Sequence, residues 1–358
     1  MDGFAQNVSE TFSDATAAGL NAGRSDANIR DPSLCASPFQ EAFQATLHFV
    51  RATFATEMAN KQLFYHGMDH VQSVVRRSCL IFDTVLPFLD SASESSVSWE
   101  RQRRLLQLSA LAHDMIQVFV PQVDPHVPRQ RESGRSEAAT FEQLRNFMIQ
   151  LDCTPDGDAV FTAADIALVR EAISATVCHV DPIEGAIYQP LLYPSLSDCG
   201  PLLDSPPSST VDGPSLSLGA RCLALADIGT LGMDGIEAYQ REGSLLLLEE
   251  NLDVVDFLLG KAEFDDALQE GLRQRLLKRA RFQVAFAKSR LARLDAELQG
   301  LPDGAIAIIK QQVFQYLTPE TITAIVETTP TDDDTSLSTL LAFFNLSAYL
   351  SAQPQSSS

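Results

Sequence analysis

Apolar residues recur at intervals of three and four along most of this chain, which is the spacing of one face of an α-helix. The pattern starts after Ser37-Pro38, a pair suited to the cap and the first turn of a helix. Sustained alternation of apolar and polar residues, the mark of a half-buried strand, is absent from the sequence. The predicted fold class is therefore all-α. Further helices are expected over residues 68–90, 97–118, 135–151, 163–178, 234–260, 264–299 and 305–350.

Two segments depart from the helical pattern. Residues 1–36 are rich in Ser, Ala, Asn, Asp and Gly, and this composition predicts a flexible N-terminal tail. Residues 181–215 hold much of the proline and serine of the chain and predict a long loop. The remainder is expected to form a helical bundle domain over 37–300 and a C-terminal helical extension over 301–358. That extension could enlarge the bundle, act as a lid or supply the contact of a homodimer.

The chain is strongly acidic, with a formal net charge of -21 at pH 7. Such a charge repels the phosphate backbone of nucleic acids, so no nucleic-acid partner is expected. A small anionic, phosphate-containing substrate is still compatible, because a bound divalent cation reverses the field inside a pocket. No run approaches the roughly 20 apolar residues of a membrane span, and the start MDGFAQNVSE lacks the features of a secretory signal. We therefore expect a cytoplasmic protein without a membrane partner.

Three histidines and two aspartates occupy unusual places in this pattern. His66 and His70 are four residues apart in YHGMDHV, which puts both on one face if that segment is helical. His113-Asp114 ends an apolar helical stretch, and Asp227 lies late in another, RCLALADIGTLG. Polar and charged groups are costly to bury among apolar residues unless they are paired or bind a cation.

A divalent metal ion would offset that cost for the whole set. Imidazole and carboxylate ligands together suit Mn, Fe, Ni, Zn or Co, with Mg also compatible. Taken one at a time, each residue has a simpler explanation, because a buried histidine is commonly hydrogen-bonded and Asp227 could pair with Arg221. The occurrence of all these segments in one chain favours the metal.

The order of these residues resembles the H…HD…D signature of the HD-domain superfamily of metal-dependent phosphohydrolases. On that resemblance, His70, His113, Asp114 and Asp227 would hold the metal in an HD-type helical bundle. The segment YHGMDHV is also similar to the YHNxxHA motif of cyclic-nucleotide phosphodiesterases, in which the first histidine protonates the leaving group. The resemblance therefore implies that His66 is the general acid. Asp114 could both bind the metal and orient the attacking water.

Further candidates come from this resemblance and from the loops beside the motifs. The segment SEAAT resembles the NExxSA segment of uncharacterised HD proteins, which makes Glu137 a candidate to orient a ligand or a bound water. HD proteins with two metals use extra histidines between the doublet and the last aspartate, where His126 and His179 lie; ordinary surface histidines are the alternative. Candidates for phosphate contacts, unless they pair with surface acids, are Arg129, Arg131 and Arg135.

The motifs match none of the well-known substrate classes of that superfamily. Met115 stands where cyclic-dinucleotide hydrolases have Gly, Gly67 replaces the Asn of the phosphodiesterase motif, and the Glu-Asp pair of alarmone hydrolases is missing. We expect metal-dependent hydrolysis of a phosphate ester or nucleotide. The alternatives are a catalytically silent metal-binding or ligand-sensing module, and an oxygenase with a di-iron centre on the same scaffold.

Overall fold

A computed structural model describes residues 38–89, 98–151, 159–193 and 216–352. All of them belong to one compact unit, Pro38–Ser358. The segment expected to form an N-terminal tail lies outside the described residues, as does most of the loop expected over 181–215.

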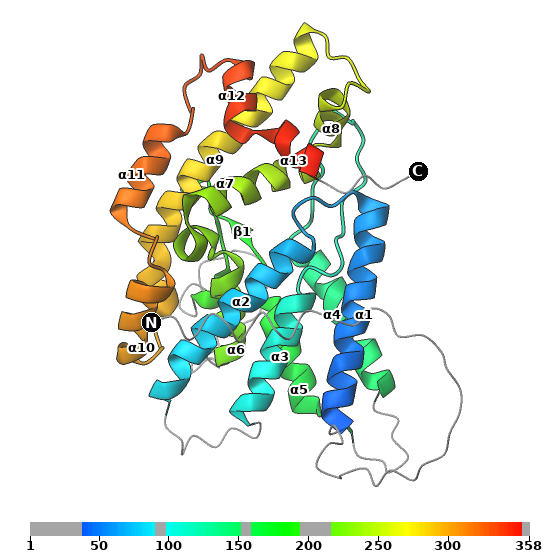
Figure 1. Ribbon diagram of the computed structural model, residues 1–358, viewed down its shortest axis with the longest axis vertical. Coiled ribbons are helices and arrows are strands. Elements are labelled where there is room, and N and C mark those ends of the chain that lie inside the picture. Colours follow the sequence, from blue (N-terminus) through cyan, green and yellow to red (C-terminus); the bar gives the residue numbers. More distant parts are fainter. Residues whose placement is uncertain (1–37, 90–97, 152–158, 194–215, 353–358) are drawn as a thin grey trace, which may run out of the picture. The chain divides into compact units, whose positions relative to one another are not determined.

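The described chain is all-α, as the apolar spacing predicts (Figure 1). Two short antiparallel strands are its only sheet within the described ranges, with His179 opposite Tyr188. The first half of the chain contains α1 (Pro38–Lys61), α2 (Met68–Val85), η2 (Leu86–Phe88), α3 (Trp99–Ala112), α4 (Arg135–Leu151), α5 (Ala163–Ser174), β1 (His179–Val180), β2 (Ile187–Tyr188) and η3 (Pro190–Leu192).

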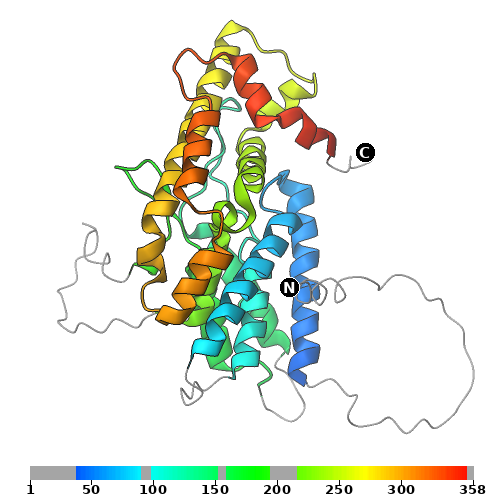
Figure 2. The same cartoon turned by 60° about the vertical axis from the view of Figure 1, so that its left-hand side comes forward.

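The second half begins with α6, the helix that carries the last aspartate of the predicted metal site. Its elements are α6 (Leu218–Asp227), α7 (Thr230–Glu250), α8 (Leu252–Leu258), α9 (Asp266–Leu298), α10 (Asp303–Ile308), a π-helical turn η5 (Ile309–Val313), α11 (Pro319–Thr328), α12 (Leu337–Phe344) and α13 (Leu346–Ala352). The long helix α9 packs against both α11 and α12 (Figures 1 and 2). No helix in the described ranges is both long and apolar enough to cross a bilayer.

The helices α2, α3, α5 and α6 pack together and place the predicted site. Between Ala220 and Ala226, every residue of α6 is buried, which explains why all of them except Arg221 are apolar. Three of these helices bring one end to the same region: α2 its first turn, and α3 and α6 their last residues. Side chains at these ends can therefore meet, although they are far apart in the sequence.

The helix α3 ends at Ala112 rather than at residue 118 as predicted. The backbone N–H groups that follow the helix donate to side chains of other helices and not to helical carbonyl oxygens. The N–H of Ile116 donates to Thr140 Oγ1 at 3.0 Å, and the N–H of Val118 donates to Ser136 Oγ at 3.0 Å. The helix α5 also ends early, at Ser174, so that His179 lies on a strand and not at a helix end as predicted.

Candidate metal centre

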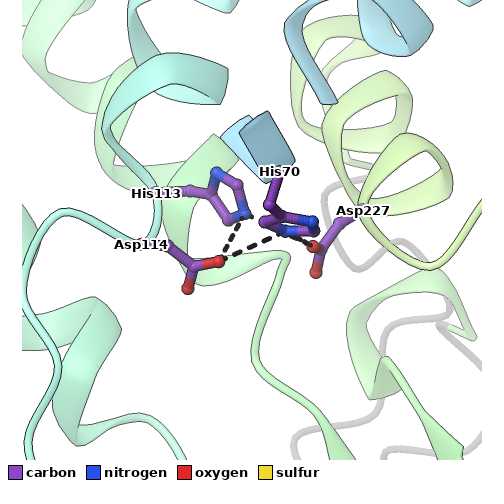
Figure 3. Close-up of side chains that lie close together, drawn as sticks. All are labelled: His70, His113, Asp114 and Asp227. Carbon is purple, nitrogen blue, oxygen red and sulfur yellow. Dashed lines mark ion pairs between the residues drawn. The ribbon is translucent and has the colours of Figure 1, made fainter. Parts of the chain in front are cut away.

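Four side chains from three helix ends converge on one point (Figure 3). His70 comes from the first turn of α2, His113 is the C-cap of α3 with Asp114 directly after it, and Asp227 is the last residue of α6. Their ligand atoms all lie within 4.8 Å of one another. Among the described residues, no other group of three or more His, Cys, Asp or Glu side chains comes together in this way.

The spacing of these atoms fits a single ion. Nε2 of His70 lies 3.3 Å from Asp114 Oδ2 and 3.4 Å from Asp227 Oδ1, and Nε2 of His113 lies 3.1 Å and 3.3 Å from the same two oxygens. Ligand atoms about 2.1 Å from one ion, at tetrahedral or octahedral angles, are roughly 3.0 to 3.4 Å apart. The two carboxylate charges also equal the charge of a divalent cation. The four residues can therefore hold a metal ion.

The tautomer of His113 favours metal binding as well. Its Nδ1 lies 2.8 Å from the carbonyl oxygen of Ala110, so in the neutral ring Nδ1 carries the proton and Nε2 has a free lone pair. Nε2 of His70 and Nε2 of His113 are buried, and neither has a hydrogen-bond partner in the described chain. Buried polar atoms are usually paired, and a cation is the partner that this set of donors suits.

Electrostatics link the four residues tightly. Burial lowers the pKa of His70, but the neighbouring carboxylates of Asp114 and Asp227 outweigh it and raise the pKa to about 9. Burial raises the pKa of Asp227, and the two imidazoles lower it to about 2. Burial likewise raises the pKa of Asp114, while the charge of His113 holds it well below the usual value. Without an ion, protons on the imidazoles serve as the countercharge, and a divalent cation would replace them.

Each aspartate also contacts a buried glutamine. Gln117 donates from Nε2 to Asp114 Oδ1 at 3.1 Å, and Gln189 donates from Nε2 to Asp227 Oδ2 at 3.0 Å. Both glutamines are completely buried. Neither was a candidate from the sequence, although Gln117 follows Asp114 by three residues and could have been noticed for that reason.

His66 lies beside the four residues but not on the helix of His70. The helix α2 begins at Met68, so the pair does not share a helix face, and the two ring centres are 6.2 Å apart. Nδ1 of His66 lies 2.5 Å from Glu249 Oε1, and Nε2 lies 4.0 Å from Asp114 Oδ2. The ring is therefore held on one side by a carboxylate and points its other nitrogen toward the centre.

Glu249 of α7 organises the segment before α2. Its Oε2 accepts hydrogen bonds from the backbone N–H groups of Phe64, Tyr65 and His66, each at 3.0 Å. Burial raises the pKa of Glu249, and the charge and hydrogen bond of His66 lower it to about 2. Glu249 was not a candidate from the sequence, because nothing in LEENLDVVD indicates a partner 183 positions away.

The three arginines proposed as phosphate contacts have different surroundings. Arg131 reaches the site, with Nη1 at 2.6 Å from His66 Nε2 and at 2.9 Å from Gln117 Oε1. Arg129 donates to the carbonyl oxygens of Lys61 and Glu249 and thereby ties its loop to α1 and α7. Arg135 is exposed and pairs with Glu132 at 3.0 Å, which is the surface pairing considered as its alternative.

Three candidates remain, Glu137, His126 and His179, and their surroundings also differ. Glu137 of α4 is half-buried, and burial raises its pKa, with smaller contributions from the charges of Asp114 and Asp227. His126 pairs with Asp253 of α8, with Nδ1 3.0 Å from Oδ2. His179 is exposed on β1. Neither of these two histidines belongs to the cluster of four.

The centre rests on this geometry and on the chemistry of its side chains. Comparisons of the chain with protein-family models, with curated proteins and with solved structures give no match.

Proposed function

We propose that this protein is a metal-dependent phosphohydrolase of the HD-domain type, which cleaves a phosphate ester or nucleotide. One observation carries the proposal: two histidines and two aspartates meet at the spacing of a single ion, with His66 and Arg131 directly beside them. Two imidazoles and two carboxylates leave further positions open on an ion of the first transition series. The order of the four residues along the chain supports the same family.

A divalent ion at the centre would polarise a phosphoryl oxygen. It would also lower the pKa of a bound water, which could then lose a proton and attack near neutral pH. The protein's own residues account for the rest of the reaction. His66 can donate a proton from Nε2 to the departing oxygen, while Glu249 holds Nδ1 and fixes the orientation of the ring. Because Glu249 also fixes the backbone of residues 64–66, the donor is positioned before any substrate arrives.

Arg131 gives the site an affinity for anions. Its guanidinium lies against His66 and Gln117, and Gln117 contacts the ligand Asp114. A phosphate bound at the ion would lie within the field of this cation, and the planar donors of arginine suit two phosphoryl oxygens. The loop of Arg131 is anchored by Arg129 and by the backbone pair of Val120 and Gln130 at 2.8 Å. The cation is therefore preorganised, which lowers the entropic cost of binding an anion.

The test is hydrolysis of a panel of nucleotides and phosphate esters with Mn²⁺ or Ni²⁺, comparing the wild type with Asp114→Ala. Asp83→Ala is the matched control, because Asp83 is an exposed aspartate paired with Arg103. Turnover by the wild type and the control that is lost in Asp114→Ala supports the proposal. A wild type that binds metal tightly but cleaves nothing across the panel contradicts it.

One contact favours a second function, a metal-binding module that senses a ligand without catalysis. Arg131 already occupies Nε2 of His66, the atom that would protonate a leaving group. If the pair stays closed, the centre binds an ion and an anion but lacks a free acid. Binding of inorganic phosphate to the metal-loaded protein, together with no hydrolysis of any ester or nucleotide in the panel, would separate this function from hydrolysis.

A further inference from the structure

The two glutamines beside the centre contact the two aspartates in the same way. Each donates its amide N–H to one carboxylate oxygen, Gln117 to Oδ1 of Asp114 and Gln189 to Oδ2 of Asp227. The other oxygen of each aspartate is the one that faces the histidines, at 3.1 to 3.4 Å. In each carboxylate, one oxygen therefore accepts a hydrogen bond from an amide, and the other faces the histidines of the cluster.

We infer that Gln117 and Gln189 are positioning residues that restrict each aspartate to one coordinating oxygen. An oxygen that accepts an amide hydrogen has a lone pair engaged and is turned away from the ion, so the carboxylate binds through the other oxygen. Two more positions on the ion then remain for ligands than two bidentate aspartates would leave. This inference rests on the metal binding in the proposed function and not on hydrolysis.

The amide oxygens extend the same arrangement. Oε1 of Gln117 accepts from Arg131 Nη1 at 2.9 Å, so this glutamine joins Asp114 to the cation that contacts His66. Oε1 of Gln189 is buried and has no hydrogen-bond partner within the described ranges. A buried acceptor next to Asp227 is suited to an O–H group bound at the ion, such as a water or a substrate hydroxyl. Gln189 would thus orient both a ligand residue and a group bound beside it.

The experiment uses the full chain loaded with Co²⁺, whose visible absorption reports coordination number. Gln117→Met and Gln189→Met keep the approximate size of the side chain and remove the amide. Gln283→Met is the control, because Gln283 is also a buried glutamine but its amide packs against Gly243 and hydrogen-bonds none of the four residues. We expect Co²⁺ affinity, measured by chelator competition, to fall about 10- to 100-fold in the first two variants only.

The visible spectrum of bound Co²⁺ separates a positioning role from a structural one, because a glutamine that only stabilised the fold would not affect the coordination number. Release of a carboxylate oxygen should raise the coordination number and weaken the visible bands in Gln117→Met and Gln189→Met. Unchanged affinity and spectra in both folded variants, or a wild type that binds no Co²⁺, overturn the inference. Gln117→Leu and Gln189→Leu replace any methionine variant whose circular dichroism shows a loss of folding. A wild type that binds Co²⁺ but hydrolyses no ester contradicts the proposed function alone.

Discussion

Asp165 and Asp227 are two aspartates in the same group of packed helices, with opposite surroundings. Asp165 lies in the first turn of α5 and accepts hydrogen bonds from Arg101 Nε at 2.9 Å and Nη2 at 2.6 Å and from Thr162 N at 2.7 Å. Asp227 is the last residue of α6 and faces two imidazoles and one amide. The first carboxylate has an arginine as its partner, whereas the second has only imidazoles and an amide.

The helix dipole makes this difference more informative. An acid at a helix N-terminus is favoured by the partial positive charge there, whereas an acid at a C-terminus meets partial negative charge. Asp165 is therefore stabilised three times over, by the dipole, the capping box and Arg101. Asp227 has an unfavourable position, which protons on the two imidazoles or a cation bound at the cluster would offset. A largely buried acid at a helix C-terminus that faces histidines and no arginine or lysine is thus a signal for a metal ligand.

The largest expected difference between the two aspartates concerns activity. Replacing the ligand, as in Asp227→Ala, removes several kcal/mol of electrostatic stabilisation and should lower kcat/KM about 10³-fold or more. Asp165→Asn should leave the rate of the folded protein nearly unchanged. The measurement is hydrolysis of an activated phosphodiester at saturating Mn²⁺, and equal loss in both variants would remove the distinction.

Metal should stabilise one aspartate variant and not the other. At an ion concentration about 1,000 times Kd, binding to the folded state raises the free energy of unfolding by about 4 kcal/mol. Urea denaturation with Ni²⁺ and with EDTA should show this gain in the wild type and in Asp165→Asn, but not in Asp227→Ala. A similar gain in Asp227→Ala would mean that the ion binds elsewhere.

Asp165→Asn should cost about 3 kcal/mol of stability with or without metal, because it leaves Arg101 without its carboxylate. Arg101 holds the pKa of Asp165 below its usual value against the opposing effect of burial. A depressed folded-state pKa gives stability that is present above the unfolded value and lost as pH falls through the folded one. The difference between wild type and variant in urea should therefore shrink as the solution is acidified below pH 4. A difference that grows on acidification would contradict the assignment.

Arg131 and Arg135 provide a smaller contrast between a site cation and a surface cation. Arg131→Ala removes a charged hydrogen-bond donor beside the centre and should cost about 2 kcal/mol of substrate binding, seen mainly in KM. Arg135→Ala should change KM little, because Arg135 pairs with Glu132 at the surface. Steady-state kinetics on the same ester compare the two. An unchanged KM in Arg131→Ala would exclude the anion contact.

The smallest expected effect is the dependence of metal affinity on pH. The pKa of His70 is about 9 in the metal-free protein, so below that pH the ion must displace a proton. For the proton of His70 alone, apparent affinity should fall about tenfold for each unit of pH below 9, which is about 1.4 kcal/mol. The raised pKa also stabilises the metal-free fold fully below pH 6.5, and this stability is lost as pH rises through 9. Calorimetry and urea melts should thus show opposite slopes with and without metal.

Local patterns in the sequence account for the all-α class and for much of the candidate centre. Apolar spacing predicted both ends of α4, and the polar segment TTPTDDDT lies between α11 and α12. The same spacing placed His113 and Asp227 at the ends of buried helices. The same spacing predicted α3 and α5 to be longer than they are. After α3, backbone N–H groups bond to side chains of other elements, and after α5 the chain forms a strand.

The sequence by itself determined which residues are chemically unusual: His70, His113, Asp114 and Asp227 stand out because burial of such groups in apolar helices needs compensation. Only the tertiary structure decided which other side chains contact them. Glu249 and Gln189 come from segments with no local signal, and only helix packing brings them to the histidine and the aspartate that they contact. Helix formation depends on residues a few positions apart, whereas a site depends on contacts between distant parts of the chain, which local periodicity does not encode.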